Sequence, residues 1–232
     1  MGSWGLGLLD NDGALDAVGA LSRGIWKDIE ELVRLPPSGA GAGSLAAAVG
    51  LLLQLSPYAF KSAFEATIRA AIERQRPSFA DLAPPARALL DAIARGSGAE
   101  LASRRGERSD ELRRALGGYV SHVREPSLFE HPASVAYTQS FVDQTAESLD
   151  AGLFRDGFDL YETDFLGGLA ILLLVRPSRL ARPRVERWRD RMRTSFARLR
   201  EENPGSPDLA MFAQYMDNVE TAFTVALREL AV

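Results

Sequence analysis

The fold class of this chain is decided near its C-terminus, by the stretches VERWRDRMRTSFARL (185–199) and LAMFAQYMDNVETAFTVALREL (209–230). In both stretches apolar residues recur in alternating steps of three and four, which places them on one face of an α-helix. The first stripe consists of Val185, Trp188, Met192, Phe196 and Leu199. The second consists of Leu209, Phe212, Met216, Val219, Phe223, Leu227 and Leu230. Residues 203–207, NPGSP, join the stretches in a loop short enough to predict an antiparallel helical hairpin.

Helical spacing also recurs upstream of this hairpin. Apolar stripes predict further helices over residues 15–32, 60–72, 112–123, 134–151 and 163–175. The stretch 44–55 is apolar nearly all round and predicts a buried helix. Period-2 alternation is absent apart from an ambiguous 135–138. We therefore expect an all-α protein, an irregular bundle of about eight helices that ends in the hairpin.

Proline and glycine mark the connections between these helices. Pro36 and Pro37 end the first helix, and Pro84 and Pro85 begin another. The glycine-rich residues 38–43 predict a flexible connection, and residues 96–108 predict a mobile surface loop. We expect residues 1–232 to form a single helical domain, with a subdivision near residues 96–108 as the alternative.

Composition excludes several kinds of active site. The 232 residues include no cysteine, so thiolate nucleophiles, cysteine-ligated zinc and iron–sulfur clusters are ruled out. The two histidines, His122 and His131, lack a metal-binding spacing, and no phosphate-binding loop or serine-nucleophile motif is present. A chain of this length folds without a metal or disulfide. We expect no catalytic residue, no metal and no cofactor.

Charge is unevenly distributed along the chain. Residues 176–202 contain ten arginines and four acidic residues, a local charge of +6 that leaves −10 on the remainder, although the formal net charge is only −4. The arginines of the predicted helix flank its apolar face on both sides: Arg187, Arg191 and Arg198 on one, Arg189, Arg193 and Arg200 on the other. Such rows fit a solvated face or an acidic protein partner. Nucleic acid is not expected, because acidic residues interrupt the rows and no exposed aromatic residues lie among them.

The first residues, MGSWGLGLLDNDGALDAVGAL, carry a distinct motif. Its members are Trp4, Gly5, Gly7, Asn11, Asp12, Ala14 and Asp16. This motif resembles the start of a family of uncharacterised bacterial proteins, domain of unknown function 4259, and the resemblance extends over residues 1–55. It implies no activity, because the family has none established.

Two interpretations of this N-terminal segment stay open. In one it is a structural clasp, with Trp4 buried and Asp10 or Asp12 capping the first helix. In the other, Asp10, Asp12 and Asp16 line a ligand or partner site.

These features favour binding over catalysis. We expect a bacterial, cytoplasmic protein that binds another protein, as a regulatory or immunity-type factor. One alternative is a carboxylate-dependent metal enzyme that uses Asp10, Asp12, Asp16, Glu162 and Asp164. The other is a homo-oligomer in which the hairpin pairs with its copy.

The cellular location is predicted from two features that the sequence does not show, a secretory signal and a membrane-spanning segment. The first basic residue is Arg23, so no secretory signal is apparent. The apolar runs 45–55 and 165–175 are about half the roughly 20 residues needed to span a bilayer, so no membrane association is expected.

Overall fold

The computed structural model describes residues 7–10, 12–55, 64–103, 110–117, 125–158, 168–169, 172 and 180–229. Every regular element among these residues is a helix, which confirms the all-α prediction. The chain divides into two compact units. Unit 1 comprises Met1–Val18, Arg108–Tyr119 and Val142–Val232, and unit 2 comprises Gly19–Glu107 and Val120–Phe141.

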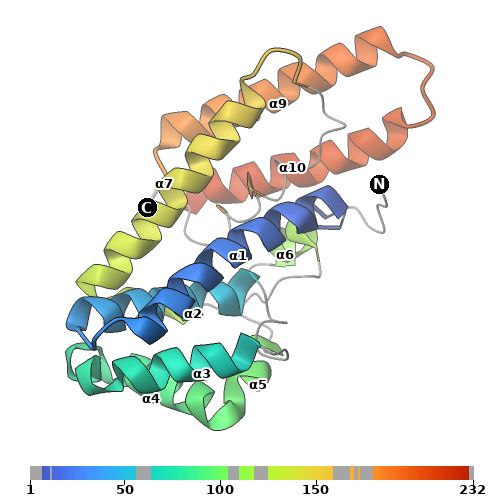
Figure 1. Cartoon of the computed structure of the whole chain (residues 1–232). Helices are drawn as coiled ribbons and strands as arrows, with labels where there is room; N and C mark the ends of the chain where they lie inside the picture. The colour runs from blue at the N-terminus through green and yellow to red at the C-terminus, as the bar shows by residue number, and fades with distance from the viewer. Residues whose placement is uncertain are drawn as a thin grey trace. The chain divides into compact units, whose positions relative to one another are not determined.

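Unit 2 is built around α2 (Gly39–Leu55), which is buried over most of its length. It also contains most of α1 (Asp12–Arg34), then α3 (Phe64–Gln75), α4 (Pro84–Ala92), α5 (Gly98–Ser103) and the beginning of α7 (Pro132–Leu153). A 3-10 turn over Arg76–Asp81 follows α3 and leads toward α4 (Figure 1). The predicted stripes of α1 and α3 supply buried residues such as Ile25, Ile29 and Ile68.

The prediction of a flexible connection over residues 38–43 is wrong, because α2 already begins at Gly39. Ser38 caps the helix, since its Oγ accepts a hydrogen bond of 3.0 Å from the Gly41 N–H. A Cβ added at Gly41 would lie 2.6 Å from Gln75 Oε1, and one at Gly43 would collide with the His131 ring. These glycines therefore let neighbouring side chains approach the α2 backbone closely.

Gln75 is fully buried and joins the end of α1 to the start of α2. Its Nε2 donates to the Leu32 carbonyl at 3.0 Å, and its Oε1 accepts from the Ser38 N–H at 3.2 Å. The side chain thus supplies partners for groups that helix ends leave unpaired.

The prediction of a mobile loop over residues 96–108 is wrong in its first part. Residues Ile93–Ser97 form a single π-helical turn, in which Gly96 has φ of 105°, and α5 follows directly. Residues 104–109 lie outside the described part of the chain.

Unit 1 contains α6 (Asp110–Leu116), α9 (Arg182–Glu202), α10 (Leu209–Glu229) and the C-terminal part of α7. In Figure 1, α9 and α10 lie side by side and the chain turns between them. Arg182, at the start of α9, donates to the Leu227 carbonyl near the end of α10 at 3.2 Å. Most of the residues of both predicted stripes are buried: Val185, Trp188, Met192, Leu199, Phe212, Met216, Val219, Phe223 and Leu227. Packing within unit 1 therefore buries most of both stripes.

Two other predicted helices are described only in part. The helix predicted over residues 112–123 is α6, which ends at Leu116, and Gly117 follows with φ of 91°. Of the helix predicted over 163–175, only residues 168, 169 and 172 are described, and all three are helical.

Candidate functional site

The N-terminal motif is described from Gly7 onward, so Trp4, Gly5 and Asn11 lie outside the described residues. Leu8 and Leu9 are fully buried, and their N–H groups donate to the Ala115 and Leu116 carbonyls of α6 at 2.9 and 3.0 Å. The motif is thus attached to a segment more than a hundred residues further along the chain.

Gly7 and Gly117 form the closest part of this attachment. A Cβ at Gly7 would lie 2.5 Å from the Gly117 Cα, and one at Gly117 would lie 2.5 Å from Asp10 Oδ1. Asp10 Oδ2 in turn accepts from the Gly7 N–H at 2.9 Å. Burial and then the negative charge of Asp10 raise the pKa of Tyr215 on α10 above its ordinary value. Gly7 and Asp10 therefore have packing partners within unit 1.

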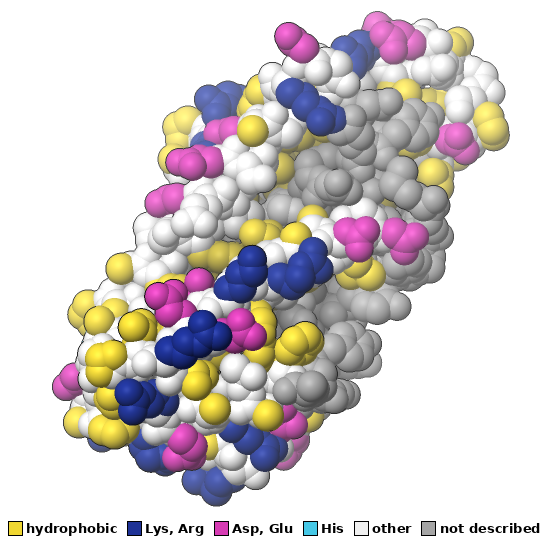
Figure 2. All heavy atoms as spheres, viewed as in Figure 1, with side chains coloured by type: hydrophobic (Ala, Val, Ile, Leu, Met, Phe, Trp, Pro, Cys, Tyr) yellow, Lys and Arg dark blue, Asp and Glu magenta, His cyan; other side chains and the backbone are white. Residues whose placement is uncertain are grey.

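Asp12 and Asp16 are exposed on α1. Figure 2 shows both acidic and basic side chains along α1, whose charged residues run from Asp12 and Asp16 at its start to Arg34 at its end. Among the described residues no three Asp, Glu or His side chains are grouped as metal ligands. Glu162 and Asp164, the other acids of the predicted metal site, lie outside the described residues, as does His122.

The arginines of α9 lie on the two flanks of the helix, as their spacing predicts. One flank carries Arg184, Arg187, Arg191 and Arg198, separated by steps of three, four and seven. We call these four residues the α9 arginine row. Their guanidinium groups contact the C-terminal end of α7 and the turn that follows it.

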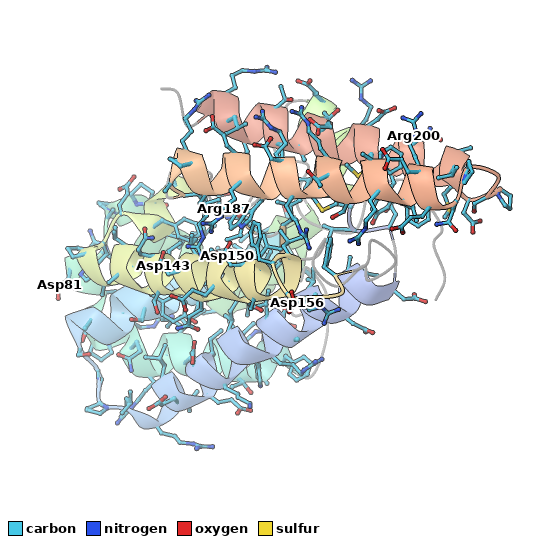
Figure 3. The ribbon with its side chains drawn as sticks, turned by 90° about the horizontal axis from the view of Figure 1, so that it is seen from above. Asp81, Asp143, Asp150, Asp156, Arg187 and Arg200 are labelled. Atoms are coloured by element: carbon cyan, nitrogen blue, oxygen red, sulfur yellow. The ribbon has the colours of Figure 1, made fainter. Side chains whose placement is uncertain are left out.

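Asp150 of α7 is the anionic centre of these contacts. Its Oδ2 lies 2.8 Å from Arg184 Nη2 and 3.2 Å from Arg187 Nη2. Its Oδ1 accepts a 2.5 Å hydrogen bond from the indole N–H of the fully buried Trp188. In Figure 3, Asp150 and Arg187 lie opposite one another between α7 and α9.

The environment of Asp150 favours its ionised form. Partial burial alone would raise the pKa of this carboxyl, but the hydrogen bonds from Trp188 and Arg184 and the charges of Arg184 and Arg187 outweigh it. The pKa of Asp150 is consequently held below its ordinary value.

Arg191 and Arg198 meet neutral groups instead. Arg191 Nε donates to the Leu153 carbonyl at 2.8 Å, and Arg198 Nη2 donates to the Phe158 carbonyl at 3.2 Å. Leu153 is the last residue of α7, where a cation is favourable because helix carbonyls are unpaired there. The carboxylate of Glu202 lies 3.8 Å from Arg198 Nε.

The other flank of α9 faces α10 and carries Arg189, Arg193 and Arg200. Arg193 donates two hydrogen bonds to Glu220 of α10, at 2.5 and 2.6 Å. Arg189 Nε is buried and has no hydrogen-bond partner among the described residues, and Asp190 Oδ1 lies 3.7 Å from it. Arg200 is exposed near the C-terminal end of α9 (Figure 3) and has no ion pair with a described residue.

Asp150 and Glu220 were not among the residues predicted from the sequence. Each lies on a different helix from its arginine partners, 27 to 37 positions away in the chain. Periodicity within one helix identifies the arginine rows, but it carries no information about which acid will face them. A pairing between separate helices is fixed only by the tertiary fold.

Comparisons with protein-family models, curated proteins and solved structures found no match to this chain. Among the described residues, no helix combines the length and the hydropathy required to cross a membrane.

Proposed function

We propose that this chain acts by binding another protein, and that the α9 arginine row meets an acidic segment of that partner. The observation that carries the proposal is the charge balance of the row. Its four guanidinium groups form ion pairs with only two carboxylates among the described residues, Asp150 and Glu202, which leaves two positive charges in excess. Arg187 and Arg198 remain accessible, with side chains 58% and 53% exposed.

The contacts of Asp150 support a carboxylate as the chemistry recognised. Arg184, Arg187 and Trp188 already surround one carboxylate with hydrogen-bond donors, so the row has the geometry that acidic side chains require. A nucleic acid is a poorer match, because its continuous row of phosphates would also meet Asp150, Glu202 and the nearby Asp190, whereas an acidic segment can place a few carboxylates between them. Complementary charge of this kind steers association and selects partners.

In this proposal the chain is a regulatory or immunity-type factor of the bacterial cytoplasm. We also propose that its N-terminal motif relates it to domain of unknown function 4259. The alternatives have less support. A carboxylate-dependent metal enzyme would need grouped acids, and self-association through the apolar stripes of α9 and α10 would need those stripes to be exposed.

Co-purification from the organism of origin tests the proposal. Tagged full-length protein is compared with the double variant Arg187→Gln/Arg198→Gln and with Arg34→Gln/Arg95→Gln, which removes two exposed arginines of unit 2. Captured proteins are identified by mass spectrometry, and the interaction is repeated with purified components. We expect an acidic partner that the first double variant fails to retain and the second retains.

A partner retained equally by both double variants would contradict the assigned surface. Failure to recover any specific partner would contradict the binding function itself.

A further inference from the structure

We infer that the segment recognised at the α9 arginine row carries an apolar side chain between its carboxylates, and that Phe154 receives this side chain. The inference rests on the proposed function and names the kind of partner segment. The feature behind it is the exposed ring of Phe154, which lies beside Arg187 of the row and corrects the expectation that no exposed aromatic residue lies among these arginines.

Phe154 is the first residue after α7, and its N–H donates to the Asp150 carbonyl at 3.0 Å. Its side chain is 42% exposed, and it is one of several large apolar side chains that are exposed among the described residues. The guanidinium carbon of Arg187 lies 5.0 Å from the centroid of the ring. The ring is therefore held beside the charge that a partner carboxylate would approach.

Phe158, four residues later in the same turn, provides an internal comparison. Arg191 lies over its ring, with the guanidinium carbon 5.6 Å from the centroid, but Phe158 is only 2% exposed. Of two phenylalanines that each stack with an arginine of the row, one is buried in unit 1 and the other faces solvent. Burial accounts for Phe158, whereas Phe154 contacts Arg187 and still leaves 42% of its side chain exposed.

The residues between these rings do not change the charge balance. Arg155 and Asp156 are both exposed and carry opposite charges, so the turn adds no net charge to the row. A partner that places carboxylates near Arg187 and Arg198 and an apolar side chain on Phe154 would satisfy both features. Aromatic residues and arginine are also the side chains most enriched at the centres of protein interfaces.

Fluorescence anisotropy with purified full-length protein tests this inference. The probes are a short labelled glutamate-rich peptide with one central leucine, and the same peptide with serine in place of that leucine. A labelled single-stranded oligonucleotide and vesicles of phosphatidylglycerol and phosphatidylcholine are measured alongside. The protein variants are Phe154→Ala, Arg187→Gln and, as a matched control, Met211→Ala, which removes another exposed apolar side chain of unit 1.

We expect wild type to bind the leucine peptide about fivefold more tightly than the serine peptide, or better. Phe154→Ala should remove this preference and leave binding of the serine peptide unchanged, whereas Met211→Ala should keep the preference. Arg187→Gln should weaken the binding of both peptides.

Equal affinity for the two peptides would overturn the inference and leave the proposed function standing. A leucine preference that survives in Phe154→Ala would also overturn it, as would tighter binding of the oligonucleotide or the vesicles. Failure of both peptides to bind overturns the inference too, whereas the proposed function is judged separately by co-purification.

Discussion

At the scale of single residues, Asp150 organises the polar contacts of unit 1. One carboxylate accepts hydrogen bonds from two arginines and a buried tryptophan, so it joins α7 to α9 through charge as well as packing. Sequence periodicity identified Trp188 as a buried residue and Arg187 as a flanking one, and both placements are confirmed. Their shared partner could not be predicted, because the contact depends on how two separate helices pack.

Replacing Asp150 by asparagine should destabilise the protein. The asparagine keeps an acceptor for Trp188 but loses the charge that Arg184 and Arg187 meet, at a cost of about 1–3 kcal/mol in the free energy of unfolding. The control is Asp190→Asn on α9, whose carboxylate is 66% exposed and should contribute less than about 0.5 kcal/mol. Urea unfolding measures both, and equal midpoints for the two variants would contradict the assigned role.

The stabilisation from Asp150 should depend on pH in a defined direction. Its pKa is lower in the folded protein than in the unfolded chain, where it is about 3.9, so the ionised form favours folding. The contribution is complete above the unfolded pKa and is lost as pH falls through the folded pKa. The difference in urea midpoint between wild type and Asp150→Asn should therefore be constant from about pH 7 to about pH 5 and shrink below about pH 4. A difference that grows on acidification would contradict this account.

At the scale of elements, glycine can mark either a flexible connection or a helix position where a neighbouring side chain packs against the backbone. The spacing of apolar residues predicted α1, α7, α9 and α10 well, because each buries one face. The same reasoning failed at residues 38–43, where glycine was taken as a sign of flexibility. There the glycines lie inside α2, and the neighbouring Gln75 and His131 occupy the space that side chains would fill. Which use applies depends on neighbours distant in sequence, and so it is not visible in a local pattern.

Two glycine-to-alanine substitutions should have opposite effects on stability. Gly117→Ala combines a φ of 91° with a Cβ placed 2.5 Å from Asp10 Oδ1, so it should cost about 2 kcal/mol or more. Gly24→Ala lies within α1 and meets no atom within 4 Å, so it should stabilise the protein by about 0.5–1 kcal/mol. Urea unfolding of each variant against wild type gives the comparison. A neutral Gly117→Ala would mean that the attachment of the N-terminal motif to α6 contributes little.

At the scale of the whole molecule, the distribution of charge is more informative than its total. The sequence alone predicted that a formal charge of −4 contains a strongly basic segment near the C-terminus. The structure adds that its arginines are used on both flanks of α9, toward α7 on one side and α10 on the other. Many of these arginines therefore form ion pairs and hydrogen bonds within unit 1. The proposed partner binds only the positive charge of the α9 arginine row that exceeds the charge of its carboxylate partners.

The central claim, that this row binds an acidic partner, is tested most directly by the dissociation constant of the purified partner at several salt concentrations. We predict that Arg187→Gln/Arg198→Gln weakens binding at least tenfold and makes it less dependent on salt, while Arg34→Gln/Arg95→Gln leaves both unchanged. The same dissociation constant and the same salt dependence for wild type and for both double variants would contradict the claim.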